Sequence, residues 1–336
     1  MCKPKPIFAH MPFHIKLKIV GFADYISRFR IRKCSKELQS IVDKSKFDYK
    51  LLVIYIGESA VTLRFQNTFI DYSHGNVGPF GGRIPYVPED GIEKYKIEGP
   101  KHYFTTSIQE GYIERALADF ATFIKSPKCS VNRWFLIAQK HCQTEKLWTV
   151  TNVVFPFLNR YLESLNRKLA VTDFRCCFSV IPDDLLQILP HLQPGYLEIV
   201  VLAIHNAEVA RVAALEQWKR ARSGVMHGAF VPLTEYLHFR QLKVREYSLQ
   251  PHDVEMLIER ALLITDGDDW FYEVSFPAGY DTRIAYMAIR DYPKLNGSDE
   301  HRVIKMTNNP YHLLITLNSD LIWFERIVLK ENDVVG

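Results

Sequence analysis

Hydrophobic and polar positions alternate with a helical period near the start of the chain. Ile15, Ile19 and Phe22 recur at the i, i+4, i+7 spacing of one helical face. Pro12 stands just before this run, where the first turn of a helix tolerates a proline. The pattern therefore predicts a first helix that begins near Pro12 and ends at Gly21.

A second helical pattern follows and is amphipathic. Its apolar stripe consists of Ile31, Cys34, Leu38, Ile41 and Val42, and its basic stripe of Arg28, Arg32 and Lys36. We expect one helix here, preceded by a helical turn at residues 25–28. The two patterns define a unit at residues 11–45. A unit of this size is below the ~40 residues at which an isolated core usually holds. It is therefore either an interaction module supported by another protein or a helical cap on a larger domain.

The pattern changes to strands beyond residue 48. Apolar runs at residues 50–57 and 60–72 predict a β-meander. Residues 73–102 concentrate glycine and proline, which predicts a long loop or a mobile insertion. We place the boundaries of this second region at residues 48–100.

Helices and strands then alternate. Helices are expected at residues 106–126, 152–167, 182–192, 212–222 and 251–265, and strands at 131–138, 172–180, 195–204, 236–249, 270–276, 283–290, 301–306, 311–318 and 321–329. This order is typical of βα units with a parallel sheet. The expected fold is α/β: a small helical unit, then an irregular leucine-rich-repeat-like βα solenoid over residues 101–265, and a β-rich extension over 266–330.

Composition fits a globular protein with a packed core, since 47% of the 336 residues are hydrophobic and 24% are charged. No apolar run approaches the ~20 residues of a membrane span, and no signal peptide is evident. We expect the protein in the cytoplasm, the nucleus or both. The six cysteines form no C-x-x-C pair and are expected to be free thiols.

Charge is distributed unevenly along the chain. Residues 1–50 hold twelve Lys or Arg against four Asp or Glu, an excess of +8 within a total formal charge of +4. Such a basic segment fits either nucleic acid or an acidic protein surface. The basic stripe has no interleaved aromatic platform and no zinc or helix-turn-helix signature, so nucleic acid is disfavoured.

Candidate chemistry is sparse. The groups considered were the glycine-rich residues 78–83, the carboxylates Asp266, Asp268 and Asp269, the adjacent His141 and Cys142 with Cys129, and the pair Asp183 and Asp184. None has the spacing of a phosphate loop, a calcium loop or a zinc site, and the last pair suits the first turn of a helix. No catalytic residue, metal ligand or cofactor is predicted.

Residues 11–43 resemble an F-box. Met11 and Pro12 stand in the Leu-Pro position of that motif, the spaced Ile15 and Ile19 follow, and Ile26 and Phe29 come next. The segment at 31–38 stands where F-boxes carry Arg, an apolar residue, Ser and Lys.

The remainder resembles the nematode F-box A proteins, whose C-terminal part is the FTH domain. Their Leu-Glu-Gln-Trp-Lys signature is matched by Leu215, Glu216, Gln217, Trp218 and Lys219. Residues 189–202 match a second pattern of the family, with Leu-Pro, Leu-x-Pro-Gly and a strand.

The resemblance implies a non-catalytic, substrate-recruiting subunit of a cullin-RING ubiquitin ligase. The F-box would dock on the Skp-type adaptor, which contacts the cullin, and the FTH domain would hold an unknown target protein. Docking would use Pro12, Ile15, Ile19, Ile26, Phe29 and Leu38. Two alternatives stay open: an interaction scaffold without ubiquitin transfer, and an enzyme hidden in the βα sheet.

The signature tryptophan has two interpretations. It lies among charged residues, so it is either a core anchor or an exposed contact for a partner. Val212, Leu215, Trp218 and Ala221 step by three along one side of the expected helix, which favours the core anchor.

Overall fold

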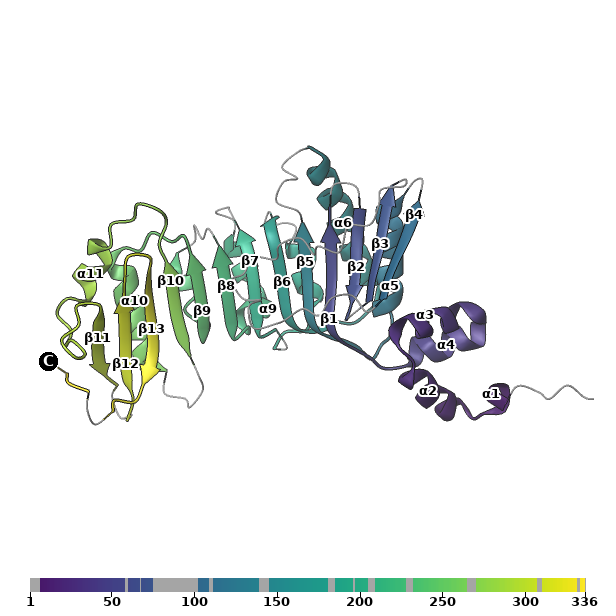
Figure 1. The fold of residues 1–336 in the computed structure, drawn as a ribbon, viewed down its shortest axis with the longest axis horizontal. Coiled ribbons are helices and arrows are strands. Elements are labelled where there is room, and N and C mark those ends of the chain that lie inside the picture. Colours follow the sequence, from purple (N-terminus) through teal and green to yellow (C-terminus); the bar gives the residue numbers. More distant parts are fainter. Residues whose placement is uncertain are drawn as a thin grey trace, which may run out of the picture. The chain divides into compact units, whose positions relative to one another are not determined.

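The computed structural model describes residues 7–57, 60–66, 68–74, 102–108, 111–138, 145–180, 185–195, 197–204, 209–227, 232–264, 270–306, 310–330 and 333–335. The chain divides into two compact units. The first comprises Met1–Phe178 and Gln187–Gln193, and the second comprises Ser179–Leu186 and Pro194–Gly336. Figure 1 labels the elements along the ribbon.

The first unit begins with four short helices: α1 (Ile7–His10), α2 (Phe13–Phe22), α3 (Tyr25–Cys34) and α4 (Lys36–Lys44). The first predicted helix is confirmed, although it ends one residue beyond Gly21. The single amphipathic helix expected after it is wrong, because Ser35 interrupts it. The backbone of Ser35 is extended, and its hydroxyl accepts a hydrogen bond from the Leu38 amide at 3.1 Å, so a new helix starts there.

Six strands follow in the first unit: β1 (Phe47–Ile56), β2 (Ala60–Phe65), β3 (Thr68–His74), β4 (His102–Ile108), β5 (Cys129–Ala138) and β6 (Ala170–Val180). They pair in the order β6-β5-β1-β2-β3-β4. β1, β5 and β6 are parallel, β2 is antiparallel to both of its neighbours, and β4 is parallel to β3. The meander is confirmed, with three strands because Gln66 turns the chain at a φ of 57°. Of the predicted loop, residues 75–101 lie outside the described part.

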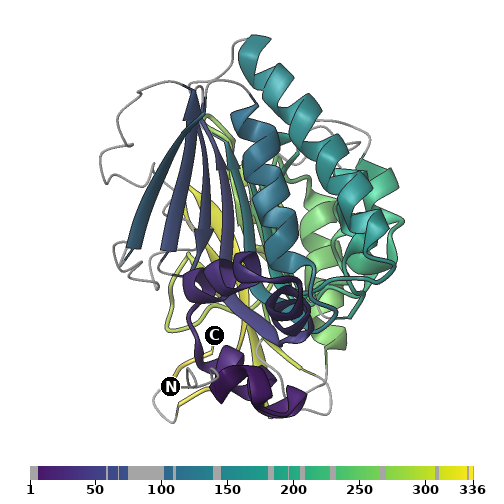
Figure 2. The same cartoon turned by 90° about the vertical axis from the view of Figure 1, so that its right-hand side faces the viewer.

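Two helices, α5 (Tyr112–Ile124) and α6 (Glu145–Ser164), cover one face of this sheet (Figure 2). The core lies between them and the strands. Phe120 of α5 packs on Trp134 with ring centroids 5.7 Å apart, and Trp134 meets Phe174 edge-on at 5.4 Å. The Tyr72 hydroxyl also donates a hydrogen bond to Asp119 at 2.8 Å. Parallel strands covered by helices are the βα arrangement that the sequence predicts.

The second unit holds seven strands: β7 (Ile199–Ile204), β8 (Ser223–His227), β9 (Gln241–Arg245), β10 (Phe271–Ser275), β11 (His301–Lys305), β12 (His312–Leu317) and β13 (Leu321–Ile327). β7 to β10 run parallel in sequence order, and β13, β12 and β11 continue the sheet with antiparallel pairing. The predicted β-rich end is confirmed in its last three strands.

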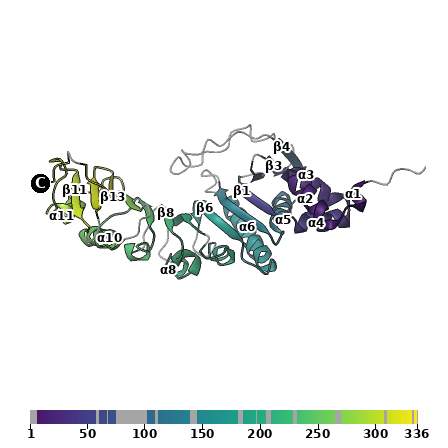
Figure 3. The same ribbon diagram turned by 90° about the horizontal axis from the view of Figure 1, so that it is seen from below.

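The helices of the second unit are α8 (Val209–Ala213), α9 (Glu216–Lys219), α10 (Pro251–Leu263) and α11 (Arg283–Ile289). Figure 3 shows α10 and α11 on one side of the strands. The strand expected at residues 283–290 is wrong, because this segment forms α11. Its two buried residues, Ala285 and Ile289, are four positions apart, which is a helical spacing. The helix expected at residues 212–222 is two short helices, and residues 189–191 form a 3-10 turn.

The protein is therefore a mixed α/β structure with N-terminal helices and two mixed sheets. Within the described part of the chain, no helix combines the length and the apolar character needed to cross a membrane.

Candidate functional site

Helix α2 presents apolar side chains to solvent. Phe22 is 91% exposed, Phe13 45% and Ile19 41%. On the inner side of α2, Val20 packs in the core with Ile41 of α4. These exposed apolar side chains make α2 the candidate site among the described residues.

The buried side chain of Lys16 connects α2 to α1 and α4. Lys16 is buried and pairs with Glu37 at the start of α4, and its ammonium lies 5.9 Å from the ring centroid of Phe8. This pair joins the face of α2 that turns inward to α4, so the apolar residues on the other side of α2 remain outside.

Arg28 fixes the helices to the beginning of the sheet. Its side chain is buried and donates hydrogen bonds to three main-chain carbonyls: Ala23 at 2.8 Å, Lys46 at 2.8 Å, and Gly21. The guanidinium also lies 4.9 Å from the centroid of the Phe47 ring. One side chain therefore connects the end of α2, the start of α3 and the first residues of β1.

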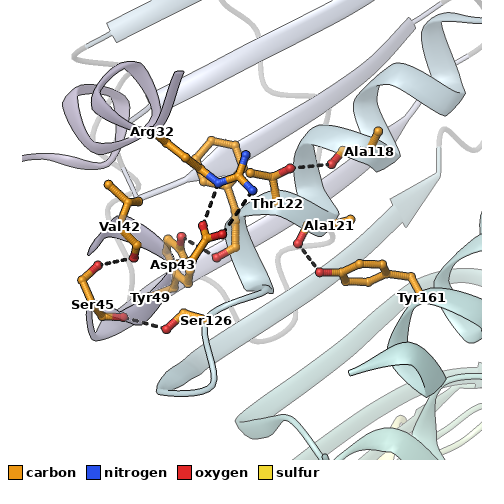
Figure 4. Close-up of polar contacts among 11 residues, drawn as sticks. Arg32, Val42, Asp43, Ser45, Tyr49, Ala118, Ala121, Thr122, Ser126 and Tyr161 are labelled. Carbon is orange, nitrogen blue, oxygen red and sulfur yellow. Dashed lines mark hydrogen bonds and ion pairs between the residues drawn. The ribbon is translucent and has the colours of Figure 1, made fainter. Parts of the chain in front are cut away.

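Polar contacts continue this connection along α4 (Figure 4). Arg32 of α3 makes two hydrogen bonds to the Asp43 carboxylate of α4, at 2.7 and 3.3 Å. The Ser126 hydroxyl, just before β5, donates to the main-chain carbonyl of Ser45 at 2.6 Å. Only two residues, Ser45 and Lys46, separate α4 from β1. The link between the helices and the sheet is thus short and hydrogen-bonded.

Aromatic side chains complete the contact between the helices and the sheet domain. Phe29 of α3 stacks on Phe123 of α5 with centroids 5.1 Å apart and planes 17° apart. The Tyr49 hydroxyl of β1 donates to the Phe123 carbonyl at 3.0 Å. Burial raises the pKa of Tyr49 well above its ordinary value, so the phenol keeps the proton that it donates. Tyr25 donates to the carbonyl of Asp48 at 2.9 Å.

The six residues predicted to contact an adaptor lie in different environments. Pro12 and Ile19 are exposed, whereas Ile15 and Leu38 are half-buried. Phe29 is half-buried against Phe123, inside the chain. Ile26 belongs to α3, but its side chain is outside the described part of the structure. Their role in binding remains a prediction.

Sequence reasoning did not select the two most exposed aromatic residues, Phe13 and Phe22. Phe22 continues the predicted stripe of Ile15 and Ile19, and this signal would have found it. Phe13 lies outside that stripe, and Lys44 of α4 sits 5.2 Å from its ring centroid. That contact depends on how α4 packs against α2, and the local sequence around Phe13 does not indicate it.

The signature tryptophan lies in the core of the second unit, as the sequence favours. Trp218 is 1% exposed, and its indole N–H donates to the carbonyl of Glu235 at 3.1 Å. The His238 ring nitrogen Nε2 bonds the Trp218 carbonyl at 2.8 Å. Burial lowers the pKa of His238 from its ordinary value, which favours the neutral ring. Trp218 therefore organises the segment that leads to β9.

The other signature residues divide by exposure. Gln217 is buried beside Trp218, Leu215 precedes the short helix α9 and is half-buried, and Lys219 is exposed. Glu216 forms an exposed ion pair with Arg220 at 3.2 Å.

A glycine permits the close packing behind this tryptophan. Phe239 meets Trp218 edge-on with centroids 5.2 Å apart. A Cβ atom placed on Gly224 of β8 would lie 2.9 Å from the Phe239 ring, so only glycine fits there. The environment of Trp218 is therefore that of a structural anchor.

Several groups considered for chemistry lie outside the described residues: His141, Cys142, Asp183, Asp184, Asp266, Asp268, Asp269 and the glycine-rich residues 78–83. Among the side chains that the structure does describe, no group of three or more His, Cys, Asp or Glu could hold a metal ion. The described cysteines Cys34, Cys129 and Cys176 are free thiols.

Comparison with known proteins agrees with the positions of the two regions. An F-box domain model matches residues 8–50, and an FTH domain model matches residues 152–264. F-box A protein 224 of Caenorhabditis elegans is 21% identical over 259 residues, which cover 75% of this chain and 62% of that protein. The chain thus spans less than two thirds of this relative's length. No solved structure is significantly similar to the chain. The chain therefore carries an F-box and an FTH domain, and it is similar to an F-box A protein.

Proposed function

We propose that this chain is the substrate-recruiting subunit of a cullin-RING ubiquitin ligase and binds a Skp-type adaptor through its F-box. The observation that carries the proposal is the exposed apolar face of α2, formed by Ile19 and Phe22, within a matched F-box. Removing these side chains from water would stabilise a complex, since burial contributes roughly 25 cal/mol per Å² of apolar surface.

Charge around this face suits an acidic adaptor. Three helices of the F-box carry exposed lysines: Lys18 on α2, Lys33 on α3, and Lys36 and Lys44 on α4. A basic surface accelerates encounter with an acidic partner, and salt screens the effect.

The connection to the sheet supports a positioning role. Arg28, the Arg32–Asp43 pair and the Phe29–Phe123 stack hold the F-box against β1 and α5. A target held on the same unit would keep a defined distance from the adaptor. The chain would then act by proximity, bringing a target lysine to a ubiquitin carrier, and catalysis would belong to other subunits.

The finer assignments belong to the same proposal. We place target binding in the FTH domain and regard its βα units as an irregular leucine-rich-repeat-like solenoid, supported by the parallel pairing of β5 with β6 and of β7, β8 and β9. We also propose that the protein acts in the cytoplasm, the nucleus or both. The domain boundaries at residues 11–45, 48–100, 101–265 and 266–330 remain predictions.

Adaptor binding is tested with the full chain and a purified Skp-type adaptor. We expect a 1:1 complex for wild type and a loss of affinity of at least about tenfold for Ile19→Asp, because a carboxylate would enter the apolar interface. Leu263→Asp is the matched control, since Leu263 is a highly exposed leucine on α10, outside the F-box. An absence of binding by wild type would sink the proposal.

The alternative is an interaction scaffold without ubiquitin transfer. The two functions differ in the fate of a bound target. A ligase subunit predicts that the level of a bound target rises when the proteasome is inhibited and that Ile19→Asp has the same effect. A target that binds the FTH domain but keeps its level under both conditions would favour the scaffold.

A further inference from the structure

One face of the sheet in the second unit carries aromatic residues without a covering helix. α10 and α11 lie on the other side of strands β9 to β13 (Figure 3). Along β10 the residues Tyr272 and Val274 are buried towards the helices, and Phe271 and Glu273 alternate with them and are half-buried. The uncovered face of a sheet is ordinarily polar, so the half-buried rings of Phe271 and Trp323 on this face call for a physical explanation.

Two aromatic rings and two carboxylates form a checkerboard on this face. In the pairing of β10 with β13, Phe271 stands opposite Glu325, and Glu273 stands opposite Trp323. The rings of Phe271 and Trp323 stack with centroids 5.1 Å apart and planes 7° apart. We call these four residues, together with Lys243, the aromatic platform.

One half of the aromatic platform already holds a cation. The Lys243 ammonium of β9 pairs with Glu273 at 2.6 Å, and it lies 5.5 Å from the Phe271 centroid and 5.6 Å from the Trp323 centroid. A positive charge within about 6 Å of an aromatic face is attracted by the ring quadrupole. The carboxylate and the two rings therefore act together on one ammonium.

The second carboxylate, Glu325, shares these two rings with Glu273 but is not paired with Lys243. Glu325 lies beside the same two rings, and among the described residues it forms no ion pair. Its cross-strand neighbours are Phe271 on β10 and Leu314 on β12, neither of which is charged. The next residue, Arg326, points to the opposite face, where its register partner is the buried Leu313.

We propose that the aromatic platform binds a basic side chain, foremost an arginine, of a protein partner. The guanidinium would pair with Glu325 and lie over Trp323, as the Lys243 ammonium pairs with Glu273. Arginine fits better than lysine because its planar group accepts a carboxylate and an aromatic face at once. The inference rests on the proposed function in one respect: it takes the partner to be the recruited target, and it extends the target-binding surface from the FTH domain to strands β10 and β13.

The test uses the full chain and four pools of nine-residue peptides. Each pool is random except for a fixed central Arg, Lys, Leu or Glu. We expect the chain to retain the Arg pool at least about tenfold more than the Leu or Glu pool, with the Lys pool between them. Raised salt should weaken this preference, since the site is partly exposed.

Three variants test which residues produce the preference for the Arg pool. Glu325→Gln should abolish this preference with little change in side-chain shape, and Trp323→Leu should reduce it. Glu255→Gln removes an exposed carboxylate on α10 and should leave it unchanged. Melting temperatures establish that each variant is folded.

Specific outcomes overturn the inference. They are equal retention of all pools, preference for the Leu or Glu pool, or an Arg preference that survives Glu325→Gln. Adaptor binding is measured on the same preparation, so the two proposals can fail separately. Loss of the Arg preference with adaptor binding intact contradicts the platform alone, and absence of adaptor binding contradicts the ligase role alone.

Discussion

At the scale of single residues, the most informative side chain is Trp218. It is surrounded in sequence by charged residues, yet its ring is enclosed by Tyr236, His238 and Phe239. The spacing with Val212 and Ala221 predicted this burial, and both of those residues are buried. The carbonyl that accepts its indole N–H belongs to Glu235, which no sequence pattern near Trp218 indicates.

Truncation of this residue should be costly. Trp218→Ala removes a fully buried ring and leaves the Glu235 carbonyl without its donor, so we expect the free energy of unfolding to fall by about 3 to 5 kcal/mol. Urea denaturation followed by circular dichroism measures the change. Glu216→Ala, an exposed neighbour, should stay within about 0.5 kcal/mol of wild type. Equal stability of the two variants would contradict the anchor role.

The histidine beside Trp218 should make stability depend on pH. Burial lowers the pKa of His238 below its ordinary value of 6.5, so the unfolded chain binds a proton more readily than the folded chain. Its contribution is fully present above that value and is lost as the pH falls through the folded pKa. We expect denaturant midpoints to decrease from about pH 7.5 to about pH 5, and to decrease less for His238→Gln. A variant with an unchanged slope would rule out His238 as the source.

At the scale of elements, segments with a clear hydrophobic periodicity and turn signals were predictable, and segments whose local pattern fits both a helix and a strand were not. Strands β11 to β13 and helix α10 carry clear periodicity and turn signals, and they occur where expected. Helix α11 has only seven residues, and an apolar run of that length does not distinguish a strand from a helix. The break at Ser35 depends on a single side-chain cap inside an otherwise continuous amphipathic pattern.

In the candidate site, too, some features could be predicted from the local sequence and others could not. The sequence predicts a docking helix at α2, because apolar residues repeat on one face, and Ile19 is exposed there. It does not reveal that Phe29 packs on Phe123, 94 positions later, since such a contact depends on how α5 crosses the helices. The aromatic platform likewise depends on the pairing of β10 with β13, which are separated by two further strands in the chain.

Alanine substitutions at two phenylalanines should distinguish a residue that packs inside the chain from one that contacts the adaptor. Phe29→Ala removes the stack on Phe123, and we expect it to lower the free energy of unfolding by about 2 kcal/mol. Phe22→Ala, at the exposed end of α2, should hardly change stability but should weaken adaptor binding. Thermal unfolding and adaptor titration of both variants provide the comparison. The reverse pattern would place Phe29 in the adaptor interface.

At the scale of the whole molecule, the chain combines an F-box, with an exposed apolar helix, and a sheet region that includes the FTH domain. The F-box is too small to form a core alone, and it is supported by Arg28, Ser126 and the Phe29–Phe123 contact with the sheet domain. What the described residues offer to partners is apolar and charged surface, as a recruiting subunit requires. The FTH region contributes an anchored βα framework around Trp218.

Hydrogen exchange of the full chain, free and saturated with a purified Skp-type adaptor, tests the central claim most directly. The account predicts a complex in which the backbone amides of α2, Phe13–Phe22, exchange more slowly, whereas those of β10 to β13 are unchanged. Ile19→Asp should lose this protection at the same adaptor concentration. Failure to form a complex, or a complex that leaves the amides of α2 unprotected, would contradict it.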